Sequence, residues 1–334
     1  SANFPEDGVV DCPFDAIPPP GAVGASWARF PLGVLYILRR AGLPLTMGLA
    51  GVLHGNIPGG GMSRSASLTL NLLRALLTAN GLWPQPDMQV VDWAQAVETD
   101  YIGSPCGNLD QVMIQFARAG MATHYRPAER SVRHIPLGAA GRDLRLVSLD
   151  TGTVRPGLEK STYRIRRAEC EALVDLLREP FGIQRLADVR TPEIHAAIQA
   201  WLGATHPALG ARLRYLYHAQ ERFPRMLAAW EAGDLETLGA IFRADGHGLR
   251  DDYQISGPEL ETMCDLARAV PGVLGERMLG GGDKGAAGAI TRAEVVPALA
   301  ALIARAYPCA HPAYADRHAV HACAVVEGLT TPAW

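Results

Sequence analysis

The 334-residue sequence lacks the cysteine and histidine spacings that build disulfide frameworks and transition-metal sites. Its six cysteines are scattered and form no CxxC pair, and its ten histidines show no HxxxH or HExxH spacing. Disulfide frameworks need paired cysteines, and zinc sites need closely spaced ligands. These absences argue against both kinds of site, and we expect reduced thiols in a cytoplasmic protein.

The sequence also lacks an excess of either charge and a long uninterrupted apolar run. Lys and Arg number 31 against 34 Asp and Glu, giving a net charge of −3, which marks neither a nucleic-acid nor a membrane-surface binder. The apolar stretch FPLGVLYILRRAGLPLTMGLAGVL is broken by Pro31, Arg39, Arg40 and Pro44, too often for a membrane span, and no basic leader precedes it. We expect a soluble protein without nucleic-acid or membrane partners.

What the chain does contain is enough apolar sequence for a substantial core, 48% against 19% charged residues. The pattern is mixed up to about residue 155 and mostly helical after it, so we predict domains at 1–155 and 156–334. In the first part the pattern predicts helices over 27–42, 65–81, 88–103 and 108–120, and strands over 45–53, 121–126, 132–137 and 144–152. In the second part it predicts helices over 162–178, 191–201, 207–232, 234–249, 258–270 and 292–306.

A glycine-rich loop precedes one of these helices at NIPGGGMSRSAS, residues 56–67. A helix N-terminus is an anion site, because its first amides lack intrahelical partners and its dipole is positive there. Glycines let the backbone approach an anion closely, and serine hydroxyls are ligands for phosphate or Mg²⁺. The loop has neither a Walker A ending nor a GxGxxG pattern. The alternative interpretation is a turn with a serine cap.

Two carboxylates follow in VETDYIGSPCGNLDQVMIQF. Glu98 lies near the end of one predicted helix, and Asp110 lies in the first turn of the next, with Asn108 as the expected N-cap. A helix N-terminus favours a charged carboxylate, so Asp110 can accept a proton or orient a hydroxyl, and Glu98 can bind Mg²⁺. The alternative is that Asp110 only complements the helix dipole and Glu98 is solvated.

Five stretches, in order, resemble motifs of the GHMP small-molecule kinase superfamily and of its galactokinase branch in particular. IPGGGMSRSASL is similar to IPxGxGLSSSASL, and ETDYIGSPCGNLDQ is similar to ExxFVGxxCGxMDQ. STYRIRRAECEAL resembles SEYNxRRxECExA, DGHGLRDDYQISGPELETM resembles ESHxSLRDDYxVSxPELDxL, and RMLGGGDKG resembles RMTGGGFGG. Each similarity extends over seven or more positions.

The resemblance implies an α+β protein with the two-domain GHMP kinase fold. Its N-terminal domain would be ribosomal S5 domain 2-like, and its C-terminal domain mainly helical. The implied reaction is ATP-dependent phosphorylation of the anomeric hydroxyl of galactose or a related aldose, with ATP and Mg²⁺ as cofactors. The family resemblance also implies a monomer or a homodimer.

The resemblance also implies roles for individual residues. Ser65 and Glu98 would bind Mg²⁺, and Asp110 would be the general base or the orienting carboxylate. The ATP phosphates would lie against Gly59, Gly60, Gly61, Ser63, Arg64 and Ser65. The sugar would be bordered by Gly107, Asp110, Tyr163, Gly281, Gly282 and Asp283.

The chain departs from the family pattern at several points. Nothing in residues 1–55 matches the motif GRVNLIGEHTDYNGG, although SANFPED resembles the segment after it. We therefore expect a piece of a longer chain, a chain that has lost this part, or a degenerate relative. Arg64 replaces a serine and could attract phosphate, obstruct it or be solvated. Asp283 and Lys284 replace Phe-Gly and favour a substrate other than galactose.

Two other functions stay open at this stage. The missing front motif favours a non-catalytic sensor of sugar and nucleotide on the same fold, whereas Ser65, Glu98 and Asp110 favour an enzyme. A GHMP kinase for another small molecule is the second alternative.

Overall fold

The computed structural model describes residues 1–55, 62–153 and 162–329, which form two compact units. The first unit holds the described residues of 1–58, 63–135 and 325–334, and the second holds those of 59–62 and 136–324. The units mix helices and strands, as an α+β fold requires. Strand β3, Leu144–Asp150, belongs to the second unit, although it precedes residue 155. The domain boundary at residue 155 stays a prediction.

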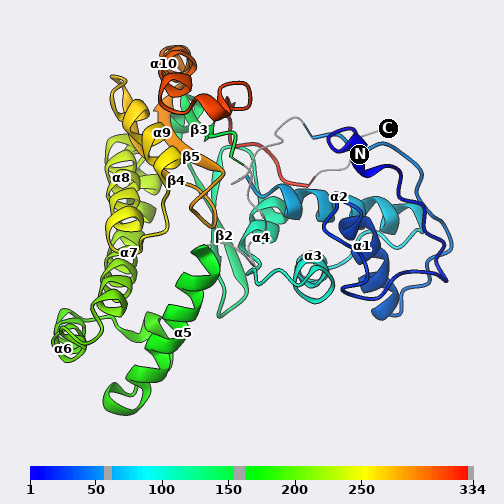
Figure 1. Cartoon of the computed structure of the whole chain (residues 1–334), viewed down its shortest axis with the longest axis horizontal. Coiled ribbons are helices and arrows are strands. Elements are labelled where there is room, and N and C mark those ends of the chain that lie inside the picture. The colour runs from blue at the N-terminus through cyan, green and yellow to red at the C-terminus, as the bar shows by residue number, and fades with distance from the viewer. Residues whose placement is uncertain (56–61, 154–161, 330–334) are drawn as a thin grey trace. The chain divides into compact units, whose positions relative to one another are not determined.

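The first unit is built around packed helices (Figure 1). Val34, Ile37 and Leu38 of α1 pack with Leu70 and Leu73 of α2, as the helical spacing of apolar residues predicts. Gly81 follows α2 with φ +66°, the left-handed conformation that ends a helix. The elements are α1 (Arg29–Arg40), α2 (Arg64–Ala79), α3 (Asp87–Ala96), the π-helical turn η2 (Val97–Ile102), α4 (Leu109–Phe116), and the paired strands β1 (Met121–Arg126) and β2 (Ser131–Pro136).

The second unit contains an antiparallel sheet in the order β4-β5-β3-β6. Its other strands are β4 (Val273–Met278), β5 (Ala286–Arg292) and β6 (Ala319–Cys323). Each helix predicted after residue 155 is present, and α7 and α8 lie side by side (Figure 1). The helices are α5 (Thr162–Phe181), α6 (Pro192–Leu202), α7 (Pro207–Ala232), α8 (Leu235–Asp251), α9 (Pro258–Arg268) and α10 (Val296–Ala310).

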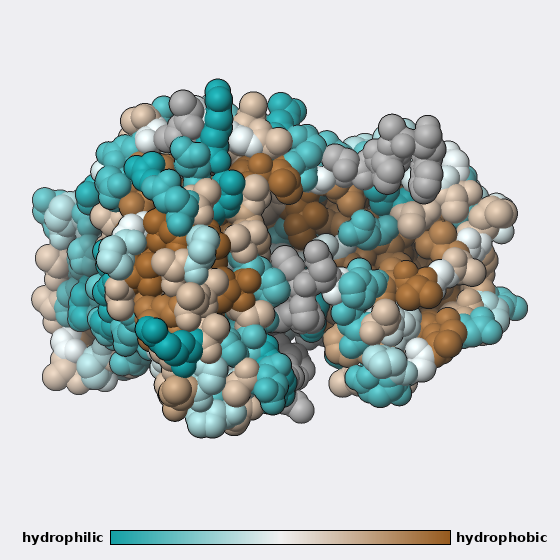
Figure 2. Space-filling view, turned by 90° about the horizontal axis from the view of Figure 1, so that it is seen from above, coloured by the Kyte–Doolittle hydropathy of each residue, from teal (hydrophilic) through white to brown (hydrophobic). Residues whose placement is uncertain are grey.

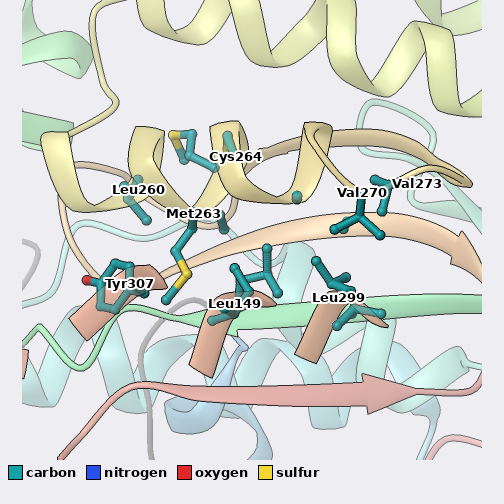
Figure 3. Packing of buried hydrophobic residues seen from close by; sticks show 14 of the residues in the cluster. Leu149, Leu260, Met263, Cys264, Val270, Val273, Leu299 and Tyr307 are labelled. Atoms are coloured by element: carbon teal, nitrogen blue, oxygen red, sulfur yellow. The ribbon is translucent and has the colours of Figure 1, made fainter. Parts of the chain in front are cut away.

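The main core of the second unit lies between this sheet and the helices α9 and α10. Figure 3 shows Leu260 and Met263 of α9 with Leu149 of β3 and with Leu299 and Tyr307 of α10 in this cluster. All of these side chains are fully buried. Burial of this apolar area is the main stabilising contribution to the unit.

One described segment, Ala293–Ala310, is long and apolar enough to cross a membrane by length and composition. Its residues Leu299, Ile303 and Tyr307 recur every four positions and are buried in the core of the second unit. The remaining positions of the segment include seven alanines and the charged residues Glu294 and Arg305. A helix with one buried stripe passes the same test as a membrane span, so this single segment is weak evidence for one.

The strand predicted over residues 45–53 is wrong, because the segment has no regular secondary structure. No described strand pairs with it, and Met47, Leu49 and Val52 are exposed. The side chain of Asn80 takes the place of a strand partner: its Oδ1 accepts from the amides of Thr46 and Met47 at 2.7 and 2.8 Å.

Hydrophobic residues reach the surface among hydrophilic ones on the face shown in Figure 2, as is ordinary for folded proteins.

Candidate active site

Glu98 is the centre of a hydrogen-bonded cluster in the first unit. Ser65 Oγ donates to Glu98 Oε2 at 2.9 Å, and Gln111 Nε2 donates to Glu98 Oε1 at 2.8 Å. Glu98 is 6% exposed and Gln111 is 1% exposed. Burial raises the pKa of Glu98 and the nearby charge of Asp110 raises it further, whereas the two hydrogen bonds oppose the shift. The carboxylate is therefore held in one orientation by donors from two helices.

Local structure explains how these groups meet. Glu98 lies in the π-helical turn η2, a distortion that often marks functional sites and that shifts the side chain from its α-helical direction. The turn ends at Gly103, with φ +80°, and the amide of Ser104 donates to the carbonyl of Glu98 at 2.8 Å. The chain then passes Gly107, which is exposed, and enters α4.

Asp110 lies in the first turn of α4, as predicted, and its side chain is exposed. Asn108 occupies the N-cap position, as predicted, although its side chain makes no capping hydrogen bond. Its Nδ2 donates instead to Tyr125 Oη at 3.3 Å. The first-turn amides of α4 thus have no side-chain cap from Asn108, which leaves the positive end of the helix beside Asp110.

At the start of α2, Ser63 has φ +52°, a left-handed conformation that is uncommon outside glycine. Its side chain makes no capping hydrogen bond, so the serine-cap interpretation fails for Ser63. The exposed Arg64 guanidinium lies over the ring of Phe4, 5.4 Å from its centroid, in a cation–π contact. Gly59, Gly60 and Gly61 lie outside the described residues.

The Ser65 hydroxyl and the Glu98 carboxylate are hard oxygen donors of the kind that Mg²⁺ prefers. Mg²⁺ is usually held by one or two carboxylates together with substrate phosphates, so this small donor set fits it. Among the residues that the structure describes, no three His, Cys, Asp or Glu side chains are grouped to hold a metal. The cluster therefore suits Mg²⁺ delivered with a phosphate ligand better than a zinc ion.

In the second unit, the glycine-rich loop between β4 and β5 packs against residues 255–259. Gly282 is buried with φ +74°, and a Cβ there would lie 2.2 Å from the carbonyl oxygen of Ile255. Asp283 accepts a hydrogen bond from Thr162 Oγ1 at 2.5 Å. Lys284 Nζ lies 3.3 Å from both carboxylate oxygens of Glu259. The loop is thus fixed at several points.

The structure brings the predicted residues together in two groups. Ser65, Glu98 and Asp110 lie near one another in the first unit, whereas Tyr163, Gly281, Gly282 and Asp283 belong to the second. Sequence reasoning missed Gln111 and Thr162, which hold Glu98 and Asp283. Both stood inside the quoted motifs, directly after Asp110 and directly before Tyr163, and that adjacency was the available signal.

Comparison with known proteins shows the family to which the chain belongs. The family model described as the GHMP kinases N terminal domain matches residues 29–118, a range that includes Ser65, Glu98 and Asp110. A galactokinase of Exiguobacterium sibiricum is 31% identical over 308 residues, covering 92% of this chain and 76% of the relative. A galactokinase of Streptomyces coelicolor is 36% identical over 291 residues, covering 85% and 71%. The chain belongs to the galactokinase family.

Solved structures agree with this galactokinase fold. The structure of Lactococcus lactis galactokinase complexed with galactose matches with a TM-score of 0.83 and 27% identity, over 98% of this chain and 81% of that one. Mevalonate kinase of L. major in complex with R-mevalonate matches with a TM-score of 0.54 and 19% identity, which shows the common GHMP kinase fold alone.

Proposed function

We propose that the chain transfers the γ-phosphoryl group of ATP to the anomeric hydroxyl of galactose. The observation that carries the proposal is the hydrogen-bonded pair of Ser65 and Glu98, placed within the segment that the GHMP kinase model matches. Membership of the galactokinase family and the likeness to a galactose-bound relative support galactose as the acceptor. A related aldose is the other acceptor that the same chemistry would serve.

Phosphoryl transfer needs positioning and charge neutralisation more than covalent chemistry. Ser65 and Glu98 would hold Mg²⁺, which supplies neutralisation of the phosphate charge when it is bound. The N-terminus of α2 would bind phosphate oxygens, with Ser63, Arg64 and the loop glycines Gly59, Gly60 and Gly61 around them. To reach a phosphate, the Arg64 guanidinium would have to leave the ring of Phe4.

Asp110 would act on the acceptor hydroxyl. Its carboxylate is exposed at the start of α4, where the helix dipole stabilises a negative charge. A carboxylate at such a place can orient the anomeric hydroxyl or accept its proton. Gly107, Tyr163, Gly281, Gly282 and Asp283 would border the sugar.

The wider setting is proposed on the same grounds. Residues 1–155 and 156–334 would be the two kinase domains, acting in the cytoplasm on ATP and a free sugar. The protein would be a monomer or a homodimer without nucleic-acid or membrane partners.

The test is ADP release with ATP, Mg²⁺ and galactose, compared between the parent protein and Asp110→Asn. We expect turnover that depends on galactose and falls by about 10²–10⁴-fold in the variant, the usual contribution of a positioned general base. Asp92→Asn, an exposed carboxylate paired with Arg130, is the matched control and should leave turnover unchanged. Saturable sugar or nucleotide binding without turnover would instead indicate a sensor, and turnover with another acceptor only would indicate a different kinase.

A further inference from the structure

Two residues that depart from the galactokinase motifs contact each other. The chain has Thr162 where the motif SEYNxRR has Glu, and Asp283 where RMTGGGFGG has Phe. Thr162 Oγ1 donates to Asp283 Oδ2 at 2.5 Å. A Glu at position 162 would bring a second carboxylate to Asp283, and a Phe at position 283 would leave the Thr162 hydroxyl without its acceptor. Thr162 and Asp283 therefore suit each other. Either one combined with the family residue at the other position would lose this hydrogen bond.

The loop side of this contact is rigidly placed. The amide of Asp283 donates to the carbonyl oxygen of Ile255 at 2.9 Å. A Cβ on Gly257 would lie 2.3 Å from the carbonyl oxygen of Asp283, so the two backbones are in direct contact. Asp283 has φ +33°, a conformation that costs free energy for a residue with a side chain and that the surrounding contacts must hold.

The helix side of the contact carries the residue proposed to border the sugar. Thr162 is the first residue of α5, and Tyr163 follows it directly. Tyr163 is partly buried and packs against the core cluster that contains Ile255 and Leu260. A helix end frays unless side chains hold it, because its terminal groups lack intrahelical partners. The Thr162–Asp283 bond therefore fixes the backbone that carries Tyr163.

We propose that Asp283 is a positioning residue for the sugar, acting through Thr162 on Tyr163. This rests on the proposed function, in which Tyr163 and Asp283 both border the sugar, and it assigns the effect of Asp283 to its hydrogen bond with Thr162. The Asp283 carboxylate is engaged by Thr162, and the charged acceptor makes this hydrogen bond stronger than a neutral one. The pair Thr162 and Asp283 thus sets galactose affinity and leaves the ATP phosphates and Mg²⁺ untouched.

The experiment compares Asp283→Ala, Thr162→Val and the double variant, with KM for galactose, KM for ATP and kcat measured for each. We expect each single variant to raise KM for galactose about tenfold, which corresponds to about 1.4 kcal/mol, with KM for ATP unchanged. The double variant should be no worse than either single one, because both remove the same contact. Thr162→Ser keeps the hydroxyl and should restore the parent KM, and the surface variant Asp265→Asn is the control.

Three outcomes would overturn the proposal. A raised KM in Asp283→Ala but not in Thr162→Val would mean that Asp283 acts on the sugar without Thr162. Additive losses in the double variant would mean that the two residues act separately. A lower melting temperature of the variants with an unchanged KM for galactose would mean that the contact only stabilises the fold.

Failure of the proposed function has a different signature, since the parent protein itself would then give no turnover with galactose. In that case the same four proteins are compared by urea unfolding with and without galactose. Coupling between positions 162 and 283 that grows when galactose is present would support the proposal, and coupling that galactose does not change would overturn it.

Discussion

Glu98 is a buried carboxylate whose two oxygens each accept a hydrogen bond from a different helix. Burying a charge is costly unless it is hydrogen-bonded, so Ser65 and Gln111 stabilise the carboxylate and also fix its direction. Side chains that orient a metal ligand contribute strongly to metal affinity without touching the metal. Gln111 would hold such a place if Glu98 binds Mg²⁺ as proposed.

Replacing Gln111 should therefore weaken Mg²⁺ binding. In Gln111→Met, Glu98 Oε1 loses its donor while the buried volume is roughly kept, and we expect Mg²⁺-dependent ADP affinity to fall about 10–100-fold. Calorimetric titration of ADP with and without Mg²⁺ measures this directly. Gln115→Met, on the same helix, is the control and should leave the affinity unchanged. An unaltered affinity in Gln111→Met would show that Glu98 needs no help from Gln111.

At the residue scale, the sequence predicted the neighbours but not all of their contacts. The motif ETDYIGSPCGNLDQ predicted Glu98 and Asp110, and the structure places Ser65 against Glu98 as a joint site requires. The role of Gln111 depends on the π-helical turn η2, which helical periodicity does not reveal. The side chain of Asn108 donates to Tyr125 and does not cap the helix, and this tertiary contact leaves no signal in the local sequence. The roles of Ser65, Glu98 and Asp110 in catalysis stay predictions.

Among the elements, helix α8 approaches strand β4 unusually closely. A Cβ on Gly239 of α8 would lie 2.4 Å from Leu274 Cβ, and a Cβ on Gly275 of β4 would lie 2.0 Å from the carbonyl oxygen of Gly239. Backbone packed against backbone cannot yield as a flexible side chain can. The glycines thus set the distance between this helix and the sheet.

Gly239→Ala should consequently destabilise the second unit. Alanine favours a helix over glycine by about 1 kcal/mol, but overpacking of a close contact costs about 1–3 kcal/mol and more where backbone must move. We expect a net loss of about 1–2 kcal/mol in the free energy of unfolding, measured by urea denaturation. Gly51→Ala has open space around its Cβ and should change stability little. Greater stability in Gly239→Ala would contradict the packing described.

The contact of α6 with α7 should respond to pH through His195. Its ring stacks on Tyr217 with centroids 4.1 Å apart, and burial lowers the pKa of His195, helped by His218 and Arg214 and opposed by Glu221. A histidine with a lowered pKa binds protons more readily when unfolded. The stability it contributes is therefore complete above its ordinary pKa of about 6.5 and is lost as pH falls through the folded value.

His195→Phe keeps the stacking and removes the titration, so it should lose less stability than the parent on acidification. Unfolding free energies at about pH 7.5 and about pH 5.5 give the comparison. His54→Gln, at an exposed histidine of the first unit, should follow the parent. Equal losses in His195→Phe and the parent would rule out His195 as the responsible group.

Helices were the elements that the sequence predicted best, because a buried stripe such as that of α7 or α10 repeats along the chain. Strands were less predictable, since a strand exists only where a partner lies beside it. The segment 45–53 has strand-like residues and no described partner, whereas β6 went unpredicted and pairs with β3 across more than half of the chain. Pairing at such a distance leaves no local signal.

For the whole molecule, the motifs identified the fold and the family, which composition and periodicity do not reveal. Composition indicated only a folded protein with a substantial core, whereas the ordered motifs predicted the α+β GHMP kinase fold and the galactokinase family. Both predictions are confirmed by the relatives and by the Lactococcus lactis structure. The domain boundary at residue 155 stays a prediction. Strand β3, which precedes that residue, pairs with β5 and β6 in the sheet of the second unit.

The central claim is that this chain phosphorylates galactose at its anomeric oxygen. The measurement that tests it most directly is phosphorus NMR of the product formed from ATP, Mg²⁺ and galactose, with the coupling between phosphorus and the anomeric proton resolved. The account predicts a sugar phosphate that shows this coupling and that forms far more slowly with Asp110→Asn than with the parent. No phosphorylated sugar from the parent, or phosphorus coupled to protons at another carbon, would contradict it.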